Sequence, residues 1–145
     1  MANEISISDV LLESAEEAFE TMIFMSLEDA SDLETELEED TLTGSIMFKG
    51  ALSGSMAIHC SMTCAKAIAT NMLAMDLIEE VSGEVVFDAI GEVVNLVMGC
   101  IKTRMHDSVG DLSVSIPSVV HGFEFKQGLG DETTEISVKV TTVRL

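Results

Sequence analysis

A carboxylate and an amide lie one helical turn apart in the most apolar stretch of the sequence. Glu92 and Asn95 are three positions apart, so a helix over residues 84–105 would place both side chains on one face. Gly91 and Gly99 flank the pair and leave no bulk beside it. This combination is typical of a docking surface for a protein partner. The alternative is a core amide between glycines that mark close helix packing.

One long helix must position this pair. Residues 84–105 contain no proline, begin with a charged turn, and carry Lys102 and Arg104 in the last turn, where cations complement the helix dipole. Two glycines inside a helix destabilise it by about 1 kcal/mol each relative to alanine, so we expect a close approach by another backbone to compensate. The polar positions recur every three or four residues and predict one narrow polar strip on a buried helix: Glu84, Asp88, Glu92, Asn95, Gly99 and Lys102.

The same stretch resembles a family of signalling phosphatases. The segment EVVNLVMG, Glu92 to Gly99, is similar to the ExxN…G signature of the CheX/CheC/FliY chemotaxis phosphatases. The flanking FDAIGEVVN and GCIK segments, and SIPSVVHG at residues 115–122, are also similar to that family. ExxN alone is a weak motif, but the flanking glycines and the IPSVVHG segment make the match specific. The likeness covers nearly the whole chain, and a single ExxN site resembles CheX more than CheC.

This resemblance implies an activity and a role for each residue. The substrate would be a CheY-type response regulator that carries an activated acyl phosphate on an aspartate. Asn95 would orient the attacking water without repelling the phosphoryl oxygens, and Glu92 would pair with the receiver's lysine and fix the docking angle. Asp88, Gly91 and Gly99 would line the partner-binding surface. The Mg²⁺ would belong to the receiver, so the resemblance implies no metal site and no cofactor in this chain.

The order of predicted elements describes an α+β fold in which helices pack on an antiparallel sheet. Apolar periodicity predicts helices over residues 10–27, 64–75 and 84–105, and a turn at 106–110. Alternation predicts strands over residues 43–49, 51–60, 112–116, 119–125 and 135–143. The resemblance refines this to a CheC-like two-layer fold with pseudo-symmetric halves, and to residues 1–145 as a single CheX-like phosphatase domain.

A faint internal repeat favours two related halves. Glu13 and Glu16 in the first helix lie 79 positions before the carboxylate and the amide of the long helix. Glu16 stands where the amide would be, and Glu20 stands where the second glycine would be. We interpret the first helix as a pseudo-symmetric partner whose site is absent or degenerate. The alternative is that any two amphipathic helices look alike.

Composition excludes several classes of protein. The net charge is −19, from 26 acidic and 7 basic residues, and there is no Trp or Tyr, which argues against nucleic-acid binding. Eight acidic residues between positions 28 and 40 predict a solvated acidic connector. The absence of a long apolar run and of a basic leader predicts no membrane span and no signal peptide, and three cysteines fit reduced thiols in the cytoplasm.

Two groups of residues with metal-ligating side chains give only weak evidence for a metal site. Cys60 and Cys64 lie beside His59, but the chain has no second cysteine pair and only three histidines. The carboxylates of the polar strip could bind a hard cation, although such a ladder on one helix is more often a solvated face. We therefore predict no metal site.

Other functions remain alternatives to the phosphatase. The first is a non-catalytic module that binds a receiver through the same surface, and the second is a structural part of a flagellar switch. The third is a homodimeric scaffold in which the polar strip is an ordinary interface. The resemblance favours a homodimer formed through sheet edges, which would leave Glu92 and Asn95 free.

Overall fold

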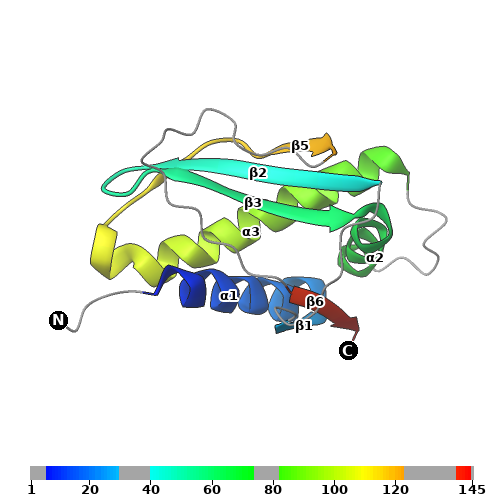
Figure 1. Ribbon diagram of the computed structural model, residues 1–145, viewed down its shortest axis with the longest axis horizontal. Coiled ribbons are helices and arrows are strands. Elements are labelled where there is room, and N and C mark those ends of the chain that lie inside the picture. The colour runs from blue at the N-terminus through cyan, green and yellow to red at the C-terminus, as the bar shows by residue number, and fades with distance from the viewer. Residues whose placement is uncertain (1–5, 30–39, 74–81, 123–139, 145) are drawn as a thin grey trace.

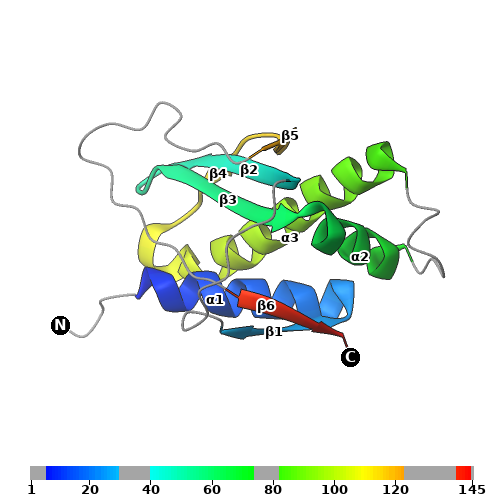
Figure 2. The same ribbon diagram turned by 45° about the vertical axis from the view of Figure 1, so that its right-hand side comes forward.

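A computed structural model describes residues 6–29, 40–73, 82–122 and 140–144. The helices are α1 (Ile7–Ala18), its π-helical continuation η1 (Phe19–Ile23), α2 (Met62–Met72) and α3 (Gly83–Val109). The strands are β1 (Met25–Asp29), β2 (Thr41–Lys49), β3 (Gly54–Ser61), β4 (Ser113–Val114), β5 (Ser118–His121) and β6 (Val140–Arg144). Helix α3 lies between the sheet that contains β2 and β3 and helix α1 (Figures 1 and 2). Within this part of the chain, no helix combines the length and apolar character needed to cross a membrane.

The larger sheet is built around β2, and all its pairings are antiparallel. On one side, β2 pairs with β3, with Leu42 opposite Cys60. On its other side, β2 pairs with β4 near Phe48 and with β5 near Leu42. Strands β1 and β6 form a separate antiparallel pair. The predicted α+β arrangement of helices on an antiparallel sheet is therefore confirmed.

Helix α3 packs very closely on β2. A Cβ atom at Gly44 would lie 2.8 Å from Val94 Cγ2 and 3.0 Å from Ile90 Cγ2. Both distances are shorter than ordinary van der Waals contacts, so these neighbours would have to move. The absence of a side chain at Gly44 thus lets the helix approach the sheet. Nine residues of α3 are buried by this packing and by the contacts with α1 and α2: Val86, Ala89, Ile90, Val93, Val94, Val97, Met98, Ile101 and Met105.

The long helix is confirmed, but its predicted end is wrong. The chain predicted to turn at residues 106–110 continues as helix to Val109 and ends at Gly110, which adopts a φ of +72°. The extra turn stays helical because its apolar members pack inward: Met105 is buried and Val109 lies against the core. At the other end, the Ser82 hydroxyl accepts the Val85 N–H as an N-cap.

The first helix lies nearer the N-terminus than predicted. With Ser6 as its N-cap it begins at Ile7, three residues before the predicted start, and it ends at Ile23, before Phe24 adopts a left-handed φ of +63°. The segment predicted as its last turn is instead β1, because it pairs with β6 more than 110 positions later in the sequence. Local periodicity carries no information about so distant a partner.

The remaining boundaries differ less. Helix α2 begins at Met62, two residues earlier than predicted, with Ser61 as its N-cap. The strand predicted over 112–116 is reduced to β4, and β5 begins at Ser118, just after Pro117, which has no N–H to donate to a ladder. The predictions for residues 30–39, 74–75, 123–125 and 135–139 lie outside the described residues.

Replacing Gly44 with alanine tests the close packing of α3 on the sheet. We expect Gly44→Ala to lower the free energy of unfolding by about 1–3 kcal/mol, because the new methyl group overpacks the contact with Ile90 and Val94. Urea unfolding followed by circular dichroism measures this. Gly83→Ala is the matched control, because no atom lies within 4 Å of its added Cβ. Equal stability of the two variants would contradict the close approach.

Candidate functional site

The predicted polar strip of α3 faces solvent. Asp88, Glu92, Asn95 and Gly99 are exposed, and Gly91 is half-buried. The strip is narrow because the positions on either side of it turn toward the sheet or toward α1 and α2. The structure therefore brings the five predicted site residues together on one face of one helix.

The side chains of Glu92 and Asn95 make no hydrogen bond or ion pair with any residue that the structure describes. Burial of the helix behind them holds the backbone, while their polar atoms remain available to a partner. This excludes, for the described residues, the alternative in which Asn95 is a satisfied core amide. The carboxylates of Glu84 and Asp88 likewise make no hydrogen bond or ion pair with any described residue.

The segment that contains β4 and β5 runs antiparallel beside the strip. His121 stacks against Phe87 with ring centroids 5.0 Å apart, and a Cβ at Gly91 would lie 3.7 Å from Val119. Farther along α3, Leu112 lines a hollow together with Lys102. One edge of the strip is thus bounded by residues 112–121.

The two glycines of the strip have different surroundings. Gly91 faces its own chain, because its added Cβ would also lie 3.9 Å from Pro117 Cγ, an ordinary packing distance. Gly99 faces open space, with no atom within 4 Å of an added Cβ. The expected close approach of another backbone is therefore absent at Gly99 within the described part of the chain. Its helix-destabilising lack of a side chain is not explained by the packing seen.

Helix α1 meets α3 through an ion-pair cluster that the sequence analysis missed. Arg104 donates to Glu13 Oε1 at 3.3 Å and to Glu17 Oε1 at 2.8 Å. These side chains are substantially solvated, so each pair contributes at most about 1 kcal/mol. The electrostatic effect of the cluster is larger than its effect on stability. It pairs Glu13 with Arg104 and so neutralises one of the few cations near the strip. No local signal indicates it, since the partners are about 90 positions apart.

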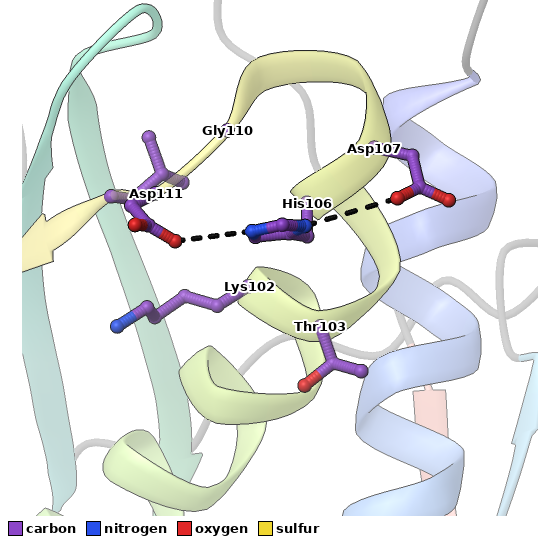
Figure 3. A pocket seen from close by; sticks show the side chains of 7 residues that line it. Lys102, Thr103, His106, Asp107, Gly110 and Asp111 are labelled. Atoms are coloured by element: carbon purple, nitrogen blue, oxygen red, sulfur yellow. Dashed lines mark ion pairs between the residues drawn. The ribbon is translucent and has the colours of Figure 1, made fainter.

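A hollow of about 380 Å³ lies at the C-terminal end of the strip, between the last turns of α3 and the start of β4 (Figure 3). His106 stands at its centre with Nε2 3.2 Å from Asp111 Oδ1 and Nδ1 3.8 Å from Asp107 Oδ1. The two carboxylates face different ring nitrogens, so they do not converge on one point with the imidazole. Lys102 and Thr103 complete the lining. Sequence analysis missed this hollow because it treated residues 106–110 as a turn.

The cysteine and histidine cluster does not form a metal site. The Thr43 hydroxyl donates to the Gly122 carbonyl at 2.7 Å, so the 2.9 Å contact with His59 requires the protonated Nδ1 of the imidazole to donate. Burial and the neighbouring Cys64 raise the pKa of Cys60 to about 12, so this thiol stays protonated at neutral pH. Over the described residues, no group of three His, Cys, Asp or Glu side chains is arranged to hold a metal ion.

Several solved structures share the α+β fold of this chain. CheX from Vibrio vulnificus is 27% identical and superposes with a TM-score of 0.65 over 90% of this chain and 82% of its own. A CheC-like protein from Shewanella sp. PV-4, also 27% identical, gives 0.64 over 81% and 79%. The CheX–CheY–BeF3–Mg²⁺ complex from Borrelia burgdorferi gives 0.69 over 96% and 90%, at 16% identity, which shows the shared fold. No curated protein matches the chain.

The family follows from the sequence match as well as from the fold. The model of the chemotaxis phosphatase CheX family matches residues 42–141, well over half of the chain. The chain therefore belongs to the CheX family of chemotaxis phosphatases. The phosphatase class predicted from the Glu92–Gly99 segment is confirmed, whereas the roles of individual residues remain predictions.

Replacing Gly99 with alanine tests whether this glycine serves partner binding at the expense of helix stability. We expect Gly99→Ala to raise the free energy of unfolding by about 1 kcal/mol, because alanine favours the helix and the added methyl group meets no atom. Urea unfolding measures this gain. If a partner approaches the strip at Gly99, phosphatase activity falls in the same, more stable, variant. A gain in stability with full activity would show that the partner does not approach Gly99.

Proposed function

We propose that this chain hydrolyses the aspartyl phosphate of a CheY-type response regulator, with Asn95 orienting the attacking water and Glu92 anchoring a lysine of the receiver. The observation that carries this proposal is that both side chains are exposed and unpaired on a helix whose other faces are buried. The Borrelia relative, which shares the fold, was crystallised with CheY, BeF3 and Mg²⁺. A receiver that carries its own Mg²⁺ would supply the charge stabilisation that this chain lacks.

The chemistry asks little of the protein beyond positioning. An acyl phosphate is already activated, so the catalyst has only to hold a water molecule in line with the phosphorus. An amide can orient that water through its oxygen or its NH₂ group, and its neutrality avoids repulsion of the phosphoryl oxygens. The buried face of α3 holds the backbone at Asn95, so the protein loses less conformational entropy when this residue positions the water.

Glu92 suits an anchoring role better than a catalytic one. A free carboxylate close to a phosphoryl group would repel it unless a cation lay between them. A receiver lysine would provide that cation, and the pair would set the angle at which the receiver meets α3. Asp88, Gly91 and Gly99 would line the same partner-binding surface, with Gly99 offering the closest approach because none of the described residues covers it.

We further propose that the fold consists of two pseudo-symmetric halves offset by 79 positions. The pairing of β2 with β5 supports this, because Leu42 faces His121, which is 79 positions later. An approximate two-fold axis through that pair would exchange the two strands. Under the same offset, Glu13 corresponds to Glu92, and its ion pair with Arg104 supports a degenerate first site.

A non-catalytic receiver-binding module is the second candidate. It shares the exposed strip, so only turnover distinguishes it from a phosphatase. The intact pair of Glu92 and Asn95, with both side chains exposed, favours catalysis over binding alone. We also propose a homodimer that leaves the strip open, which the scaffold alternative does not allow.

Replacing Asn95 removes the water-orienting amide. We expect Asn95→Ala to reduce the accelerated decay of an acetyl-phosphate-labelled CheY-type receiver by roughly 10²-fold or more, as for loss of one preorganised polar group. Receiver binding and the circular dichroism spectrum should be unchanged, because the side chain is exposed. Glu20→Ala, on the exposed face of η1, is the control. Undiminished turnover by Asn95→Ala would contradict the proposal that Asn95 orients the attacking water.

Replacing Glu92 removes the proposed anchor. We expect Glu92→Ala to raise the KM for the phosphorylated receiver about 10- to 100-fold, since a charge-assisted contact contributes about 1.5–3 kcal/mol. The kcat at saturating receiver should fall much less than in Asn95→Ala. Steady-state kinetics on both variants measures this difference. An unchanged KM with intact turnover would contradict the anchoring role.

A further inference from the structure

The flank of the strip carries an exposed apolar side chain. Ile116 lies between β4 and β5 and is 86% exposed, the highest value among the large apolar side chains that the structure describes. Its neighbour Pro117 packs beside Gly91, one position before Glu92. The chain that bears Ile116 therefore borders the polar strip, and does not lie on a remote surface.

The C-terminal end of the strip carries a free cation. Lys102 is half-buried on α3 and makes no ion pair with any described residue, although the chain is strongly acidic. Arg104, the neighbouring cation, is occupied by two glutamates of α1. In Figure 3 the Lys102 side chain extends along the hollow below Asp111. The strip thus has carboxylates toward its N-terminal end and an ammonium group toward its C-terminal end.

Both features lie within reach of a partner docked on Asn95. Seven residues separate Asn95 from Lys102, which is about 10 Å along a helix axis. A standard interface buries about 800 Å² per partner, equivalent to a disc with a radius of about 16 Å. A receiver centred on Asn95 would consequently cover Lys102 and the adjoining flank.

The chemistry of the partner fits these groups. A receiver that holds Mg²⁺ next to its phosphoryl group must surround the ion with oxygen ligands, among them carboxylates. Any receiver carboxylate near this site that is not a ligand of the ion would find its complement in Lys102, the cation of this strip. Protein interfaces combine apolar contacts with polar ones, and Ile116 would supply an apolar contact beside the polar strip.

We propose that the receiver's footprint extends from the Glu92/Asn95 pair in two directions. Along α3 it reaches Lys102, which pairs with a receiver carboxylate, and across the strip it reaches the flank at Ile116, which packs against an apolar receiver side chain. This rests on the function proposed above and adds to it the direction in which the receiver lies. The charges of the strip favour the direction toward Lys102: Glu84 and Asp88 would repel a receiver carboxylate, whereas Lys102, although Asp107 and Asp111 lie in the same hollow, offers it a cation.

The test measures binding of a CheY-type receiver held active with BeF3 and Mg²⁺ to two variants of the full chain. We expect Lys102→Gln and Ile116→Ser each to weaken the affinity about tenfold, with kcat at saturating phosphorylated receiver retained. Salt separates the two contacts: raising it from 50 to 300 mM should weaken wild-type and Ile116→Ser binding, whereas Lys102→Gln should respond less. Both side chains reach the surface, so the thermal unfolding of each variant should match the wild type.

Matched controls lie nearby. Met47→Ser removes another exposed apolar side chain, from a β2 position that alternates with the inward-facing Ile46 and so points away from α3. Lys66→Gln removes a half-buried lysine from α2. Receiver affinity should be unchanged in both controls.

The outcomes separate this inference from the proposed function. If Lys102→Gln and Ile116→Ser bind like the controls while Asn95→Ala still loses turnover, the footprint lies elsewhere and the inference is overturned alone. If the wild type neither binds nor dephosphorylates the receiver, the inference and the proposed function are both overturned. Loss of kcat without loss of affinity in either variant would also contradict a docking role.

Discussion

The close contact between α3 and β2 is the constraint on which the rest of the structure depends. Gly44 has no side chain, so the methyl groups of Ile90 and Val94 lie directly on the strand. With the sheet on one side and α1 and α2 on others, the helix can expose only a narrow strip. In the central turns of α3 the polar residues Asp88, Glu92 and Asn95 fall on that strip, because an unpaired amide or carboxylate on the packed faces would be buried at a cost of several kcal/mol.

This arrangement suits a catalyst that acts by positioning. A helix buried over most of its surface presents its exposed side chains from a backbone held by packing, and hydrolysis of an acyl phosphate requires little more than a correctly positioned water molecule. The ion pairs of Arg104 add little to stability. Their consequence is electrostatic: they occupy Glu13 on α1 and leave Lys102 as the free cation of the strip among the described residues.

Local patterns predicted the helices and strands that depend on local interactions. The long helix, its polar strip, the β2–β3 hairpin and the α+β class all followed from periodicity, and the Glu92–Gly99 segment indicated the family. The errors lie where a distant partner decides the conformation. Residues 25–27 continue a helical pattern but form β1, because β6 offers a strand partner. Residues 106–109 were predicted as a turn but stay helical, because Met105 and Val109 pack against the core.

The sequence by itself determined which side chains share a face of α3, since 3.6 residues per turn place Glu92, Asn95 and Gly99 together whatever surrounds them. Only the tertiary structure decided which face stays open, that Gly91 lies against its own chain while Gly99 does not, and that Ile116 borders the strip. These facts depend on how residues 112–121 run beside α3 and pair with β2. Contacts between segments so far apart are set by the packing of the whole core, and no local pattern encodes them.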